Sequence, residues 1–207
     1  MIAQTVQKEI RPPSRVEYFK TLIACGFSDR EITTIAQAYE FSKYGHYKQK
    51  RDDGTRYFDH PKYVAWYLFY ECQIKDASLI IEALLHDVRE DSHLLTFETI
   101  EQLFGLSSAQ SVECLSKQEG DKDISNSLQR IIDSEKHRPM LIKTADRLHN
   151  LRTLSNCSEE KQVRKIAETK KYFFIFMSEC NQYIPPIYSG IIDKMRKEMM
   201  HICDSYS

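Results

Sequence analysis

Four side chains that can bind a metal or move a proton gather at the end of one predicted helix. The segment 78–91 reads SLIIEALLHDVRED, in which an apolar run gives way to His86, Asp87, Glu90 and Asp91. In a continuous helix, residues four apart share one face, so His86 lies beside Glu90 and the two aspartates lie beside each other. Negative charge at a helix C-terminus opposes the macrodipole and is unfavourable without a cation. A divalent metal would compensate, although an exposed acidic helix end with a surface histidine would give the same pattern.

Two further segments contain candidate ligands, because an adjacent histidine and aspartate supply only two. His60, in an Asp-His-Pro run, lies at the start of a predicted helix, with the proline at a favourable first helical position. The segment 139–154, PMLIKTADRLHNLRTL, places Asp146 within an apolar stripe. Burying an unpaired carboxylate is costly, so Asp146 needs either a metal or a neighbouring cation such as Arg147 or Lys143.

The elements that must position these residues are helices, because apolar residues recur at helical spacing over most of the chain. N-terminal capping signals at Ser28, Asp76 and Ser158 support this assignment. Asp52–Thr55 is the clearest turn, and no alternating strand pattern exceeds a few residues. The sequence therefore predicts an all-α fold. The predicted helices are Val16–Cys25, Asp29–Tyr44, Pro61–Cys72, Ser78–Glu90, Phe97–Phe104, Ser127–Ser134, Pro139–Leu154, Glu159–Glu179 and Ile187–Ile202.

Composition excludes several classes of protein. The chain has 207 residues, 29 basic against 30 acidic, so no overall positive field exists to hold nucleic acid. The longest apolar stretches, around 63–70 and 172–177, are far shorter than the ~20 residues of a membrane span. The N-terminus lacks the apolar run of a secretory signal. We therefore expect a cytoplasmic protein with no membrane partner, whose six widely spaced cysteines are free thiols.

The segments that carry these residues resemble a known family. The matching stretches are GTRYFDHPKYVA at 54–65, EALLHDVREDS at 82–92, TFETIEQLFG at 96–105, LSK at 115–117 and KTADRLHNLRTL at 143–154. In this order they resemble the HD superfamily of metal-dependent phosphohydrolases, and within it the (p)ppGpp hydrolase domain of RelA/SpoT-type proteins and the stand-alone small alarmone hydrolases. The resemblance spans roughly residues 51–168. It implies a compact, all-α, multi-helix HD domain, which we expect to occupy residues 1–207 as a single domain.

The resemblance also implies a metal centre. Its ligands are expected to be His60, His86, Asp87 and Asp146. This set offers imidazole nitrogen and carboxylate oxygen but no thiolate, which suits Mn²⁺, with Fe²⁺ and Zn²⁺ as competitors. Glu90 and Asp91 match the family's catalytic pair, which orients and deprotonates the attacking water or stabilises charge on phosphorus. The alternative for Glu90 is a charge at a helix end paired with Arg89 or Lys122.

Five residues are candidate substrate contacts, and three of them match contacts of the family. Arg51 matches the arginine that lies against the guanine ring, which a planar guanidinium can do by stacking. Asn150 and Thr153, on one helix face, match contacts to the nucleotide and its sugar. Lys117 and Lys122 are candidates for binding the phosphates. Each of these residues could instead be a solvated surface side chain.

Some residues depart from the family pattern. Where the family continues with I-Y-A-P-L-A, this chain reads KKYFFIF at 170–176, so the helical part 169–207 is expected to be diverged. Arg89 stands at a commonly apolar position, and Arg56 replaces a usual proline. These changes weaken the prediction of guanosine specificity more than that of hydrolysis. Since no synthetase half follows residue 207, we expect a hydrolase that acts alone.

The sequence predicts a metal-dependent nucleotide phosphohydrolase. The favoured reaction removes the 3′-pyrophosphate of ppGpp or pppGpp and yields GDP or GTP. A second enzymatic hypothesis keeps the same machinery with another small-molecule nucleotide, for example the 2′-phosphate of NADPH. A third is a non-catalytic HD module that senses a nucleotide or binds nucleic acid through the basic block 136–171. The presence of all four ligands and the acidic pair weighs against this third hypothesis, and we do not expect a nucleic-acid partner.

Overall fold

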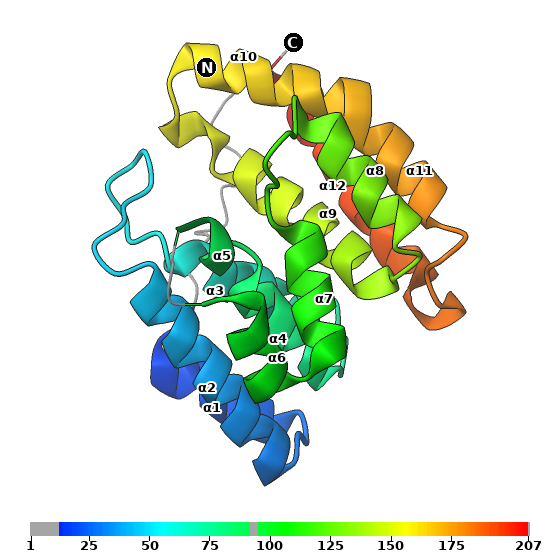
Figure 1. Cartoon of the computed structure of the whole chain (residues 1–207). Helices are drawn as coiled ribbons and strands as arrows, with labels where there is room; N and C mark the ends of the chain where they lie inside the picture. Colours follow the sequence, from blue (N-terminus) through cyan, green and yellow to red (C-terminus); the bar gives the residue numbers. More distant parts are fainter. Residues whose placement is uncertain (1–12, 92–94, 207) are drawn as a thin grey trace.

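The computed structural model describes residues 13–91 and 95–206, apart from the side chains of Glu90 and Asp91. All the secondary-structure elements in this part of the chain are helices. Lys50 and Arg56 form an isolated antiparallel β-bridge, which does not extend into a strand. The all-α prediction is therefore confirmed (Figure 1). The elements are α1 (Arg15–Ala24), α2 (Asp29–Gly45), α3 (Asp59–Trp66), the π-helical η1 (Tyr67–Glu71), α4 (Ala77–Leu85), α5 (Val88–Asp91), α6 (Phe97–Phe104), α7 (Leu106–Leu115), α8 (Ile124–Asp133), α9 (His137–Arg152), the 3-10 turn η2 (Leu154–Asn156), α10 (Glu159–Glu168), the π-helical η3 (Thr169–Phe173), α11 (Phe174–Cys180), the 3-10 turn η4 (Pro186–Tyr188) and α12 (Ser189–Ser205).

The predicted helix starts are confirmed by their caps. Ser28 and Glu31 form a reciprocal capping box at α2, in which each side chain accepts from the other residue's backbone N–H. The Asp76 carboxylate accepts from the backbone N–H of Leu79, and the Ser158 hydroxyl caps α10 in the same way. These side chains satisfy backbone donors that have no partner within the first turn of a helix.

Two helices, α4 and α9, form the centre of the core. Every residue from Leu79 to Leu85 on α4 is buried, and α9 buries most of its residues between Pro139 and Leu151. A helix that is buried on every face must be surrounded by other parts of the protein. In Figure 1, α9 runs through the middle of the molecule, and it packs on α3, α4 and α7 as well as on α11 and α12. The two central helices place His86, at the end of α4, near Asp146, in the middle of α9.

The helix predicted as Ser78–Glu90 is not continuous, and this prediction was wrong. α4 ends at Leu85, His86 is its C-terminal cap, and a new short helix begins at Val88. His86 Nδ1 lies 2.8 Å from the carbonyl oxygen of Ala83, one of the last carbonyls of α4, which lack a helical partner. The imidazole thus takes over a bond that the next turn of helix would have made. The face shared by His86 and Glu90 in a continuous helix does not exist.

The helices predicted as Pro61–Cys72 and Glu159–Glu179 each contain a π-helical turn, η1 and η3. α7 was not predicted, because its buried face includes the small polar residues Ser108 and Ser111 and gives little apolar periodicity. Among the described residues the six cysteines are free thiols, as expected. Within residues 13–91 and 95–206, no helix combines the length and apolar character needed to cross a bilayer.

Candidate metal centre and adjoining cavity

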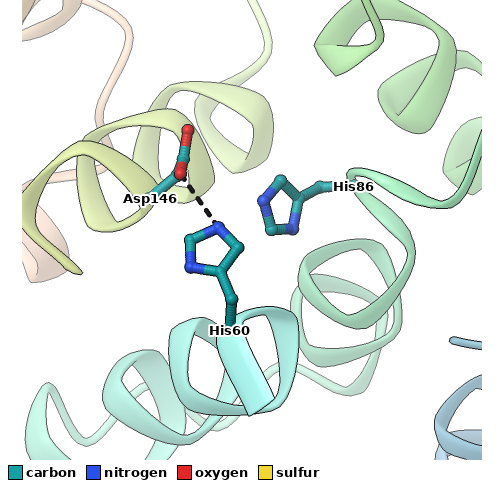
Figure 2. Close-up of side chains that lie close together, drawn as sticks. All are labelled: His60, His86 and Asp146. Carbon is teal, nitrogen blue, oxygen red and sulfur yellow. Dashed lines mark ion pairs between the residues drawn. The ribbon is translucent and has the colours of Figure 1, made fainter. Parts of the chain in front are cut away.

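Three side chains from distant parts of the sequence point toward one another in the interior. Figure 2 shows His60 of α3, His86 at the end of α4 and Asp146 of α9 converging on one point. One nitrogen or oxygen atom from each lies within 4.8 Å of the others, and all three residues are buried. His60 Nε2 lies 3.1 Å from Asp146 Oδ1. The structure thus brings together three of the four residues expected to bind a metal.

Asp87, the fourth expected ligand, lies against both imidazoles. Its Oδ1 is 3.2 Å from His86 Nε2, and its Oδ2 is 3.6 Å from His60 Nε2. The Tyr57 hydroxyl donates a hydrogen bond of 3.0 Å to Oδ2. Burial raises the pKa of the Asp87 carboxyl, but the neighbouring imidazoles of His86 and His60 outweigh this, and the net pKa lies below its ordinary value. The carboxyl group is therefore ionised at neutral pH.

The hydrogen bonding of His86 tests whether this cluster fits a cation. Nδ1 faces the Ala83 carbonyl oxygen at 2.8 Å, so in a neutral imidazole it must carry the hydrogen. Nε2 is then a bare lone pair, fully buried and without a hydrogen-bond partner among the described residues. It faces Asp87 Oδ1, which is also an acceptor, at 3.2 Å. Two acceptors this close are unfavourable alone, and a divalent cation between them would satisfy both.

Asp146 is buried beside one lysine. Burial raises the pKa of its carboxyl, but Lys143 and the bond to His60 more than offset this, so the pKa lies well below its ordinary value. Lys143 Nζ lies 3.3 Å from Asp146 Oδ2. Of the two neighbouring cations considered from the sequence, Lys143 is the partner, since Arg147 pairs with Glu168 at 3.1 Å. One Asp146 oxygen thus faces a lysine and the other faces the imidazoles.

A cavity of about 370 Å³ adjoins the cluster. This volume lies within the range of small-molecule pockets. One end is formed by Tyr57, His60, Asp87 and Asp146. Four lysines from three segments contribute to the rest of the wall: Lys117 and Lys122 of the loop between α7 and α8, Lys143 of α9 and Lys165 of α10. The same wall also carries Asp121, Asp123 and Glu168, and Lys143 and Lys165 pair with Asp146 and Glu168. Lysines beside a metal-type cluster can nevertheless bind the phosphates of a nucleotide.

The three residues predicted to bind the nucleoside lie together at the rim of this site. Arg51 Nη2 donates to Asn150 Oδ1 at 3.0 Å and lies 3.4 Å from Thr153 Oγ1. Asn150 also donates to Asp146 Oδ1 at 2.6 Å and lines the cavity. The turn containing Gly54, with φ of +77°, reverses the chain just after Arg51. Residues about 100 positions apart in the sequence thus form one surface beside the cluster.

The predicted catalytic pair cannot be placed in this site. Glu90 and Asp91 belong by backbone to α5, but their side chains lie outside the part of the chain that the structure describes. The neighbouring Arg89 forms an ion pair with Glu113 of α7. Arg89 is therefore engaged by another acid. The role of Glu90 and Asp91 stays a prediction.

Sequence reasoning missed several residues that the fold places at the site. Tyr57 binds Asp87, Lys165 lines the cavity, and His149 lies against His60. Tyr57 stands just before α3 and binds an aspartate 30 positions away, so no local spacing indicated it. Nothing in the sequence distinguishes Lys165 from the other lysines of its basic segment. Its position depends on how α10 packs.

Comparison with known proteins identifies the family of the chain. A family model described as HD domain matches residues 38–176, which is more than half of the chain. A GTP pyrophosphokinase of Myxococcus xanthus is 38% identical over 152 residues, covering 68% of this chain and 20% of that protein. The bifunctional (p)ppGpp synthase/hydrolase SpoT of Escherichia coli strain K12 is 34% identical over 166 residues, covering 76% of this chain and 23% of that protein. The chain therefore spans about a fifth of the length of these curated relatives.

A solved structure has a similar fold. It is that of a metazoan ortholog of SpoT, described as hydrolysing ppGpp, and it superposes with a TM-score of 0.59 at 24% sequence identity. The superposition covers 80% of this chain and 94% of that one. This likeness supports the fold, and the range matched by the family model includes His60, His86 and Asp146. The chain belongs to the HD domain family.

Proposed function

We propose that this chain is a metal-dependent phosphohydrolase that removes the 3′-pyrophosphate from ppGpp or pppGpp. The observation that carries the proposal is the buried cluster of His60, His86 and Asp146, which opens into a cavity lined by lysines. The reaction consumes one water and yields pyrophosphate with GDP or GTP. A site for this reaction needs a way to activate water and positive charge for the phosphates, and the cluster and the lysines are suited to these two tasks.

The metal in this proposal is Mn²⁺, with Fe²⁺ and Zn²⁺ as alternatives. His60, His86, Asp87 and Asp146 would hold it. Two imidazoles and two carboxylates form a mixed nitrogen and oxygen set that lacks thiolate, which suits these metals. When bound, such an ion lowers the pKa of water and stabilises negative charge on a phosphate. The Nε2 atom of His86 supports this assignment, because it makes no hydrogen bond to the described residues and faces a carboxylate oxygen of Asp87 at 3.2 Å.

The chain's own residues supply the remaining chemistry. Glu90 and Asp91 are proposed to orient the attacking water and accept its proton, the role of their counterparts in the family. Lys117 and Lys122 are proposed to offset the charge of the departing pyrophosphate. Lys143 is held beside Asp146 at 3.3 Å and faces the same cavity, so it adds positive charge close to the reacting phosphate. These groups lower the cost of gathering several negative charges in one buried site.

Recognition of the nucleoside is assigned to Arg51, Asn150 and Thr153. The guanidinium of Arg51 donates at 3.0 Å to the oxygen of Asn150, a residue that lines the cavity. A planar cation held in this way can stack on a purine. Guanosine is favoured over other nucleosides because relatives at 34–38% identity carry names that refer to GTP and (p)ppGpp. The 2′-phosphate of NADPH remains the second candidate substrate.

The direct experiment measures products from the full chain supplied with Mn²⁺. ppGpp, NADPH, GTP and a set of deoxynucleotides are incubated separately, and pyrophosphate is converted to phosphate by pyrophosphatase and measured with malachite green. The proposal expects pyrophosphate and GDP from ppGpp in a 1:1 ratio. Turnover of NADPH with ppGpp untouched would contradict the guanosine assignment. No turnover with any of the three metals would contradict the enzymatic assignment.

Variants of one loop separate nucleoside recognition from folding. Arg51→Ala and Arg51→Lys are both expected to raise KM for ppGpp about 5- to 150-fold, because a base-stacking contact contributes about 1–3 kcal/mol. The effect on kcat is expected to be smaller. Arg56→Ala is the matched control, since Arg56 lies in the same loop, is largely exposed and pairs with Asp59 rather than with Asn150. An unchanged KM in both Arg51 variants would remove Arg51 from the binding site.

A further inference from the structure

His149 of α9 is a buried histidine to which no role has been assigned. It lies one turn of helix from Asp146 and is 5% exposed. Its Nδ1 atom lies 2.7 Å from Nδ1 of His60, which is a hydrogen-bond distance between two ring nitrogens. The opposite nitrogen of His60, Nε2, faces Asp146 and Asp87 at the centre of the cluster. His149 therefore contacts the back of a proposed metal ligand.

The two rings can share one hydrogen between their facing nitrogens. If Nε2 of His60 binds a metal, it must present a lone pair, so the hydrogen of the neutral ring is on Nδ1. That hydrogen points at Nδ1 of His149, which must then be the acceptor and carry its own hydrogen on Nε2. A hydrogen on Nδ1 of His149 would force the opposite tautomer on His60 and block its Nε2 atom.

The surrounding residues hold the ring of His149 in position. The ring of Tyr63 on α3 packs on the ring of His149, with centroids 4.6 Å apart. The ring of His60 also contacts it, at a centroid distance of 4.8 Å. The Tyr63 hydroxyl bonds to Arg152, which in turn forms two hydrogen bonds with Glu198 of α12. His149 is thus fixed by α3, α9 and, through Arg152, by the C-terminal helix.

We propose that His149 is a positioning residue that sets the tautomer and orientation of His60 for metal binding, by accepting a hydrogen bond from its Nδ1 atom. This inference rests on the proposed metal site. Hydrogen-bond partners of metal-bound imidazoles fix the ring and raise its basicity, and their loss typically lowers metal affinity 10- to 100-fold. His149 itself touches neither substrate nor metal.

Three variants test this proposal through metal affinity. His149→Leu keeps similar bulk and removes the acceptor, whereas His149→Asn retains an acceptor oxygen near the position of Nδ1. His137→Leu is the matched control, because His137 lies at the start of the same helix and does not line the cavity. Mn²⁺ affinity of each folded, metal-free protein is measured by electron paramagnetic resonance of the free ion. We expect a 10- to 100-fold loss in His149→Leu, a loss of only a few-fold in His149→Asn, and none in the control.

A spectroscopic measurement distinguishes the hydrogen bond from packing. In ¹⁵N-histidine-labelled protein loaded with diamagnetic Zn²⁺, a coupling between Nδ1 of His60 and Nδ1 of His149 is expected, with the hydrogen on His60. Unchanged Mn²⁺ affinity in His149→Leu would overturn the inference while leaving the metal site intact. An equal loss in the Leu and Asn variants at equal stability would also overturn it. Failure of the wild-type chain to bind any of the three metals would overturn the metal site itself.

Discussion

The buried carboxylate of Glu82 is expected to make the protein less stable as the pH rises. Glu82 is fully buried on α4, and Arg138 Nε contacts its two oxygens at 3.0 and 3.1 Å. Burial raises the pKa of Glu82 to about 7, although Arg138 pulls it downward. Between the ordinary carboxyl pKa of 4.5 and this value, the folded protein keeps a proton that the unfolded chain releases. The free energy of unfolding therefore falls as pH rises through this interval.

The size of this effect follows from the difference between the two pKa values. Each unit is equivalent to 1.36 kcal/mol, so the contribution of Glu82 falls by about 3 kcal/mol between pH 4.5 and pH 7. Glu82→Gln imitates the protonated acid and removes the titration. The variant is expected to match the wild type near pH 5 and to exceed it by up to about 3 kcal/mol near pH 8.

Urea unfolding at several pH values between 5 and 8 measures the effect, with circular dichroism as the readout. The difference between wild type and Glu82→Gln isolates Glu82 from other titrating groups. Glu160→Gln, at an exposed position on α10, is the matched control and should leave the pH dependence unchanged. A wild-type protein and a Glu82→Gln variant with parallel stability curves would refute this reasoning. A variant that is much less stable than wild type at pH 8 would show instead that the ion pair with Arg138 dominates.

Three further predictions concern the metal, an ion pair and a turn. Mn²⁺ affinity should fall as the pH is lowered, because protons compete with the metal for imidazole nitrogens; isothermal titration at pH 5.5 and 7.5 measures this, and an affinity that does not change with pH would contradict it. Arg152→Ala should lower the free energy of unfolding by about 2 kcal/mol in urea, because Glu198 and the Tyr63 hydroxyl lose a charged partner; a change below about 0.5 kcal/mol would contradict this. Gly54→Ala should cost about 1 kcal/mol in the same assay, because φ there is +77°; equal stability would show that the turn adapts.

The sequence alone determined the class of fold and the candidate ligands. Caps such as Ser28 and Asp76 are local, since the side chain and the backbone it binds are a few residues apart, so their patterns are visible in sequence. The apolar character of α4 and α9 indicated buried helices for the same reason. The segments that contain His60 and His86 were selected by residue type and by their resemblance to the HD family. That resemblance also selected Asp146.

Only the tertiary structure decided how these segments meet. At the break, the side chain of His86 bonds to a helix carbonyl that the next turn of a continuous helix would have bound. α7 was not predicted because serines occupy part of its buried face, so its apolar residues show little helical periodicity. The structure buries these serines where α7 packs on α4 and α9. Local sequence patterns do not show whether a helix continues or breaks at a given residue, or which polar side chains become buried between helices.

The functional environment of the ligands was likewise a product of packing. His149 and His60 are 89 positions apart, yet their ring nitrogens lie 2.7 Å from each other. Lys165 lines the cavity near the end of α10, which the Arg147–Glu168 ion pair joins to α9, and Arg51 reaches Asn150 because a glycine turn brings its loop back. The tautomer of a histidine and the burial and pKa of a side chain depend on neighbours a few ångströms away, and at this site these neighbours lie on separate helices. Residue type and spacing determine which groups are present, and the packing of the helices determines which of them act on one another.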